Sequence, residues 1–140
     1  AMGMGIPAGI AAALRFPDRQ VFSIVGDGGA LMTGSELATA VAQKTKIRVI
    51  VANNNHYGTI RYHQEVHFPT RDHYATNLVN PDFAKYGESF GLKCFTIHNT
   101  EEIIPTIKSA MEVDGPSLIE FKMSLELNTS TTTISQLQTK

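Results

Sequence analysis

Short apolar runs alternate along this chain with segments that favour helices, and this alternation restricts the possible folds strongly. The apolar runs are residues 21–25, 47–52, 93–97 and 117–123. Helix-forming stretches separate these runs, and an Ala-rich stretch from Pro7 to Phe16 precedes the first of them. Strands that alternate with helices form a parallel sheet with helices on both of its faces. The sequence therefore predicts an α/β fold with a doubly wound, mainly parallel sheet.

Polar residues at the starts of two helical stretches predict where those helices begin. Thr33 and Glu36 have the spacing of a capping box, and good helix formers follow at 37–44. Thr100 is expected to cap a later helix that has one apolar face. The residues of this face are Ile103, Ile107, Ala110 and Met111.

The stretch between the second and third apolar runs is less regular. Residues 55–78 are aromatic, His-rich and polar, which predicts a loop with a helical turn or two near 58–66. Asn80 followed by Pro81 is typical of an N-cap with proline in the first turn of a helix. Gly91 marks the expected end of that helix.

Size and charge exclude several functional classes. The 140 residues fit one domain, predicted at 1–127, followed by a polar tail at 128–140 that is mobile or contributes to a partner. The 12 basic and 13 acidic residues give a net charge of −1, which provides no general attraction to nucleic acid or to an anionic membrane. No apolar run approaches the roughly 20 residues that a membrane-spanning helix needs.

A single cysteine, Cys94, excludes an internal disulfide and a cysteine-ligated zinc or iron–sulfur site within this chain. A buried thiol in a reducing compartment accounts for it, so we expect a cytoplasmic protein. The first residues, Ala1 to Gly5, resemble the middle of a loop. We therefore expect a fragment of a longer polypeptide or one subunit of a split enzyme.

Polar motifs follow the first two apolar runs. The first run ends in GDGG at residues 26–29, and after 24 intervening residues Asn54 lies in the NNN that ends the second run. The carboxyl ends of neighbouring parallel strands face one crevice, where open α/β sheets bind ligands. We therefore expect Asp27 and Asn54 to lie close together.

The chemistry of these side chains predicts the ligand. A carboxylate and an amide oxygen suit Mg²⁺, which completes its coordination with phosphate oxygens and water. Gly28 and Gly29 carry no side chain, so their N–H groups can approach a phosphate closely. A magnesium–phosphate site at this edge of the sheet is the prediction.

The two motifs together resemble the diphosphate-binding signature of thiamine-diphosphate enzymes. The segment VFSIVGDGGALMTGSELATAVAQKTKIRVIVANNN is similar to the acetolactate synthase and 2-oxo-acid decarboxylase branch, as is AMGMGIPAGIAAAL before it. The resemblance implies that Asp27, Asn54 and the backbone carbonyl of His56 bind Mg²⁺, and that Met2 is a wedge beneath thiamine diphosphate. The implied cofactor-binding residues are Met2, Gly26, Asp27, Gly28, Gly29, Asn54, His56, Tyr57 and Gly58.

The resemblance also implies a function. The full enzyme acts on a 2-oxo acid by decarboxylation, with or without carboligation, and is a homodimer or tetramer. An activating glutamate comes from a pyrimidine-binding domain of the same longer chain or of another subunit, so this chain alone is expected to be inactive. The alternatives are a stand-alone subunit of a split decarboxylase, an oxidoreductase subunit, and a non-catalytic anion-binding or regulatory domain.

The irregular stretch offers further candidates. His63 and His67 are four residues apart and could bind zinc on a helix, but solvated histidines of a polar loop are the favoured interpretation. In the family this segment borders the substrate pocket, so Arg61 or His63 could meet a substrate carboxylate or a CoA-like tail.

Overall fold

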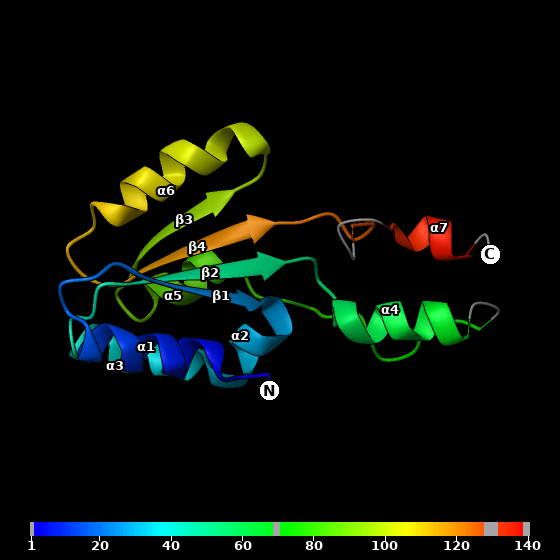
Figure 1. Cartoon of the computed structure of the whole chain (residues 1–140), viewed down its shortest axis with the longest axis horizontal. Helices are drawn as coiled ribbons and strands as arrows, with labels where there is room; N and C mark the ends of the chain where they lie inside the picture. Colours follow the sequence, from blue (N-terminus) through cyan, green and yellow to red (C-terminus); the bar gives the residue numbers. More distant parts are fainter. Residues whose placement is uncertain (1, 69–70, 128–131, 139–140) are drawn as a thin grey trace.

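The computed structural model describes residues 2–68, 71–127 and 132–138. Four parallel strands form one sheet in the order β1-β2-β4-β3 (Figure 1). The strands are β1 Val21–Gly26, β2 Ile47–Asn53, β3 Lys93–Ile97 and β4 Ser117–Lys122. The predicted α/β class and the four predicted strands are therefore confirmed.

Helices cover both faces of this sheet, as Figure 1 shows. The helices are α1 Gly5–Arg15, α2 Asp27–Thr33, α3 Leu37–Ala42, α4 Gly58–His67, α5 Phe83–Glu88, α6 Ile103–Met111 and α7 Ile134–Gln138, with 3₁₀ turns η1 Gly34–Glu36 and η2 Thr100–Glu102. Side chains alternate across a strand, so Val49 and Val51 face the core shared with α1, α3 and α5. Ile50 faces the second core, which lies beneath α6.

The helix after β1 begins earlier than the sequence predicts. The GDGG motif forms the first turn of α2, and Thr33 and Glu36 do not make a capping box. The Thr33 hydroxyl donates instead to the Gly3 carbonyl at 2.8 Å, and the Glu36 carboxylate accepts from the Thr39 hydroxyl at 2.9 Å. The capping-box prediction is wrong because Thr33 contacts a segment that is distant in sequence.

Two other predicted caps are wrong by one or two residues. Asp82 caps α5 and accepts from the Lys85 N–H at 3.0 Å, whereas Asn80 lies before the helix. Asn99 accepts from the Glu102 N–H at 3.2 Å, so Thr100 is not the cap. Three residues of the predicted apolar face of α6 pack on the sheet, but Met111 is exposed. α5 ends at Glu88, slightly before the predicted end, and Gly91, the predicted stop, has a φ of +92° and donates its N–H to the Glu88 carbonyl at 2.9 Å.

The irregular stretch contains a ten-residue helix, α4, where one or two turns were expected. The polar tail also contains a helix, α7, which packs against α4 beyond the carboxyl ends of the strands (Figure 1). Ile134 and Leu137 are its buried residues. Residues 128–131 and 139–140 lie outside the described residues, so the expected mobility of the tail and the domain boundary at 127 stay predictions.

Arg48 anchors the opposite edge of the sheet, where the strands begin. Its side chain is completely buried, and its guanidinium donates to the carbonyls of Gly115, Val113 and Met111, the last two at 2.8 and 3.3 Å. These carbonyls lie at and after the end of α6, where helices leave carbonyl groups without intrahelical partners. Burial lowers the pKa of Arg48. The carbonyls therefore replace the water that an arginine side chain normally contacts.

Cys94 is half-buried on β3, and burial together with the charge of Glu88 raises the pKa of its thiol to about 11. A raised pKa keeps the thiol protonated near neutral pH, and the thiolate is the reactive form. We expect Cys94 to react with a disulfide reagent about 100-fold more slowly in the native chain than in the unfolded chain at about pH 8. Absorbance kinetics with and without guanidinium chloride measure this ratio, and equal rates would contradict it.

No described helix is long and apolar enough to cross a membrane.

Candidate cofactor site

A cavity of about 410 Å³ lies at the carboxyl ends of β1 and β2. Its volume falls within the range of ordinary small-molecule sites, about 300–1,000 Å³. Three segments that are distant in sequence meet around it. The lining residues are Met2, Gly3, Gly5, Ile24, Val25, Gly26, Asp27, Gly28, Gly29, His56, Tyr57, Gly58, Thr59 and Ile60. Eight of the nine cofactor-binding residues predicted from the sequence are in this set, and Asn54 is the exception.

Asp27 is the buried charge of this site. Its residue is 3% exposed, because it lies where β1 ends and α2 begins. One carboxylate oxygen accepts from the Gly28 N–H at 2.8 Å and the other from the Asn80 amide at 2.8 Å. Within the described parts of the chain, no lysine, arginine or histidine forms an ion pair with it. A buried carboxylate without a cationic partner is costly, so this position is suited to a cation.

Gly28 is required where α2 passes Tyr57. A Cβ at Gly28 would lie 2.4 Å from a carbon of the Tyr57 ring, and real Cβ atoms do not approach other atoms so closely. The Tyr57 N–H donates to the Thr76 carbonyl at 2.8 Å, which fixes the backbone that carries the ring. A Cβ at Gly26 would meet nothing within 4 Å. The lack of a side chain at Gly28 therefore allows the Tyr57 ring to pack closely on α2, whereas Gly26 faces open space.

The loop after β2 holds the two remaining predicted metal ligands. The Asn54 amide oxygen accepts from the His56 N–H at 3.0 Å, and the His56 carbonyl accepts from the Gly58 N–H at 2.9 Å. The loop turns at Asn55, whose φ is +58°. His56 and Asp27 both line the cavity. Asn54 is not among the lining residues, but it belongs to the same turn as His56. The metal roles of these residues stay predictions.

The segment before α1 forms the other wall. Met2 lines the cavity and is 55% exposed, and the Gly3 carbonyl is tied to α2 by the Thr33 hydroxyl. Gly3 has a φ of +85°, a conformation that favours glycine. This turn brings Met2 to the cavity, where an apolar side chain is free to contact a ligand.

Three polar residues near the cavity were not identified from the sequence. Asn53, Asn80 and Glu120 are joined by hydrogen bonds behind Asp27. A charged residue inside the apolar run 117–123 was the available signal for Glu120, which is buried at the centre of β4. Asparagine before proline is typical of a helix cap, and this pattern gives no indication that Asn80 contacts Asp27 instead.

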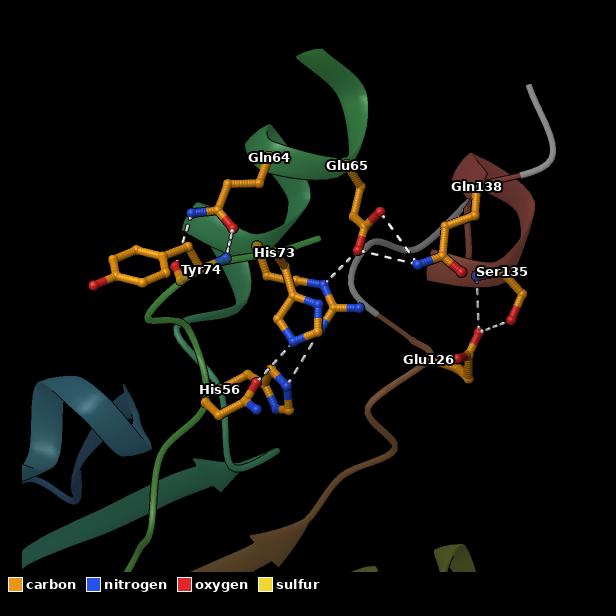
Figure 2. A network of polar contacts seen from close by, with 10 residues as sticks. His56, Gln64, Glu65, His73, Tyr74, Glu126, Ser135 and Gln138 are labelled. Atoms are coloured by element: carbon orange, nitrogen blue, oxygen red, sulfur yellow. Dashed lines mark hydrogen bonds and ion pairs between the residues drawn. The ribbon is translucent and has the colours of Figure 1, made fainter. Parts of the chain in front are cut away.

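Arg61 does not face the cavity. Its guanidinium donates to Glu65 at 2.6 Å, and the two side chains are 10% and 3% exposed. Figure 2 shows Gln138 of α7 pointing towards Glu65, with its amide nitrogen 3.3 Å from both carboxylate oxygens. A second Arg61 nitrogen lies 3.4 Å from the His56 ring. Arg61 is therefore paired within the protein, and the contact of Arg61 or His63 with a substrate carboxylate or a CoA-like tail stays a prediction.

His63 and His67 are exposed on α4, with parallel rings whose centroids are 5.9 Å apart. Among the described residues, no group of three or more His, Cys, Asp or Glu side chains could hold a metal ion. Their exposure to solvent agrees with the favoured interpretation of solvated histidines. The Mg²⁺ set predicted at the cavity differs in kind, because it uses one carboxylate, one amide and one backbone carbonyl.

Comparison with known proteins identifies the family. The model of the thiamine pyrophosphate enzyme C-terminal TPP binding domain matches residues 1–121. The acetolactate synthase large subunit of Lactococcus lactis is 37% identical over 123 residues, and the 3D-(3,5/4)-trihydroxycyclohexane-1,2-dione hydrolase of Bacillus subtilis is 35% identical over 130. These alignments cover 88% and 87% of this chain but 21% and 20% of the relatives.

A solved structure agrees with this result. The thiamine diphosphate-dependent 4-hydroxybenzoylformate decarboxylase of Rhodococcus jostii superposes with a TM-score of 0.82 at 31% identity, covering 88% of this chain and 23% of that one. The chain thus spans about a fifth of the length of the relatives it matches. The resemblance inferred from GDGG and NNN is confirmed: the chain belongs to the family of C-terminal thiamine pyrophosphate-binding domains of thiamine pyrophosphate enzymes.

Proposed function

We propose that this chain binds Mg²⁺ and the diphosphate of thiamine diphosphate within an acetolactate-synthase-like enzyme that acts on 2-oxo acids. The observation that carries the proposal is the buried Asp27 carboxylate, which borders the cavity and has no ion-pair partner in the described chain. A divalent cation would compensate this charge and bring a phosphate with it.

The proposed metal ligands are the Asp27 carboxylate, the Asn54 amide oxygen and the His56 carbonyl. All three donors are oxygen atoms, which suits Mg²⁺ better than a transition metal. The Asn54 oxygen and the His56 carbonyl belong to one turn, so the turn would present both to the same ion. Gly28 and Gly29 lie in the first turn of α2, where N–H groups have no carbonyl partner one turn earlier, and both are proposed to bind the phosphate. The Gly28 N–H donates to the Asp27 carboxylate in the structure, so a phosphate oxygen would share or replace this contact.

Residues on the other walls would position the rest of the cofactor. Met2 is proposed as the wedge beneath it, and Gly26, Tyr57 and Gly58 line the same cavity. When bound, thiamine diphosphate supplies an electron sink for the decarboxylation of a 2-oxo acid. The protein would contribute binding and orientation of the cofactor. Asp27 is the acidic side chain among the described residues that line the cavity, and it is the one proposed to hold the metal ion.

The activating glutamate is proposed to come from a pyrimidine-binding domain of the same longer chain or of another subunit. The short coverage of the relatives, about a fifth of their length, supports a multidomain enzyme. A homodimer or tetramer follows if two subunits share each site. The isolated chain is accordingly proposed to be inactive, and the cytoplasmic location expected from the single cysteine is part of this proposal.

Calorimetric titration with thiamine diphosphate tests the metal assignment. We expect the wild-type chain to bind only when Mg²⁺ is present, and Asp27→Ala to lose this binding because the anionic ligand is gone. Asp18→Ala is the matched control, since Asp18 is exposed and does not line the cavity. Binding that is independent of Mg²⁺, or unaffected by Asp27→Ala, would reject the assignment and favour a non-catalytic anion-binding domain.

A further inference from the structure

Asn80 connects the loop before α5 to the ends of β1 and β2. Its amide nitrogen lies 2.8 Å from an Asp27 carboxylate oxygen and 2.9 Å from the Asn53 amide oxygen. A third oxygen, from the Asn55 amide, lies 3.2 Å away. Asn80 is 53 residues from Asp27 in sequence, so this contact exists only in the folded chain.

The orientation of each amide in this cluster follows from the buried Glu120. Its residue is 1% exposed, and one carboxylate oxygen contacts Lys122 and the Asn53 amide nitrogen, each at 2.6 Å. An ionised carboxylate only accepts hydrogen bonds, so the Asn53 nitrogen must point to Glu120 and its oxygen must point away. That oxygen accepts from the Asn80 nitrogen and from the Asn55 N–H, at 2.9 and 3.1 Å.

The same reasoning determines the orientation of the Asn80 amide. The Asp27 and Asn53 oxygens both require a donor, so the Asn80 nitrogen must face them. Its two N–H groups serve these two acceptors at the shortest distances, while the Asn55 oxygen competes at a longer one. The Asn80 oxygen is buried and has no hydrogen-bond partner in the structure. The cluster therefore contains more acceptors than donors, as expected beside a site that attracts a cation.

We propose that Asn80 is a positioning residue, which fixes the Asp27 carboxylate against Asn53 and so sets its direction towards the bound metal ion. This inference rests on the proposed function, because it assigns a role to a residue behind the proposed Mg²⁺ ligand. A neutral donor suits this role. It holds one carboxylate oxygen without neutralising the charge, whereas a lysine at this position would compete with the cation.

Two substitutions at Asn80 test the role. Asn80→Ala removes the donor, and we expect a 10- to 100-fold loss of Mg²⁺-dependent affinity for thiamine diphosphate, the usual effect of losing a residue that orients a metal ligand. Calorimetry well below the unfolding temperature of the variant separates this loss from a change in stability. Affinity within threefold of the wild type would overturn the proposal.

Asn80→Asp has the same shape but places a second carboxylate beside Asp27. We expect a lower unfolding temperature without divalent cations, because like charges would be adjacent, and a larger increase than in wild type when Mg²⁺ or Mn²⁺ alone is added. Gln20→Glu is the matched control, since it makes the same chemical change at an exposed residue. A cation response equal to that of Gln20→Glu would overturn the proposal.

The outcome for the wild type distinguishes the two levels of this proposal. If the wild-type chain shows no Mg²⁺-dependent binding, the proposed function fails, and the positioning role fails with it. If the wild type binds and Asp27→Ala does not, the function stands, and the Asn80 variants alone decide the positioning role. Electron paramagnetic resonance of bound Mn²⁺ adds a readout of the metal environment that a purely structural residue would not change.

Discussion

Glu65→Leu is expected to destabilise the chain by about 3–5 kcal/mol, because it leaves the buried Arg61 guanidinium without its counter-charge. The two side chains are 2.6 Å apart and almost completely buried. Glu65 also accepts from Gln138, so the substitution removes a contact that holds α7 on α4 (Figure 2). Urea denaturation followed by circular dichroism gives the change in the free energy of unfolding.

The double variant Arg61→Met with Glu65→Leu is the informative control. Replacing both members of a buried ion pair by apolar residues is often nearly neutral, so we expect it to recover most of the lost stability. Equal destabilisation in the single and double variants would show that packing, not charge, holds this helix. A Glu65→Leu protein within 1 kcal/mol of wild type would contradict the prediction directly, since the expected cost is about 3–5 kcal/mol.

Arg48→Met is expected to destabilise the chain by about 3 kcal/mol, because three carbonyls at and after the end of α6 would each lose a charged hydrogen-bond donor. Methionine keeps much of the apolar stem, so the loss reports on hydrogen bonds more than on a cavity. The stability of Arg48→Lys should fall between that of the wild type and that of Arg48→Met, since an ammonium group keeps the charge but lacks the planar set of donors.

The same denaturation measurement tests Arg48. Arg19→Met is a matched control, because Arg19 is exposed and lies 5.6 Å from the Phe16 ring, a contact worth about 0.5–1 kcal/mol at the surface. If Arg48→Met changes stability no more than Arg19→Met does, the guanidinium is not holding the end of α6. A larger loss limited to Arg48→Met supports the assignment.

The sequence predicts the sheet better than the helix ends, for a physical reason. The strands are contiguous apolar runs, and the prediction of a strand from such a run does not depend on any single residue. A helix cap depends on one polar side chain, which can bond either to its own helix or to another part of the chain. Thr33 and Asn80 bond to other parts of the chain, namely to Gly3 and Asp27. The local pattern therefore identified side chains that form hydrogen bonds, but it predicted the wrong partners.

The cofactor cavity shows the same division. Asp27 and Asn54 could be placed at one edge because each directly follows a strand that the pattern makes parallel, whereas His56 entered the predicted site through the family resemblance. Asn80 could not, because its contact with Asp27 depends on how the long loop after β2 returns to the sheet. The ion pair of Arg61 with Glu65 could not be predicted either, because the sequence did not reveal which face of this helix is buried.

Arg48 and Asp27 lie at opposite edges of the same sheet, which has a consequence for protein engineering. Arg48 is near the start of β2, and a strand of this length spans about 20 Å. Substitutions separated by more than about 7–10 Å are usually additive in free energy. The edge around Arg48 can therefore be redesigned for heat tolerance, or varied in a library, while cofactor selectivity is evolved separately at the other edge.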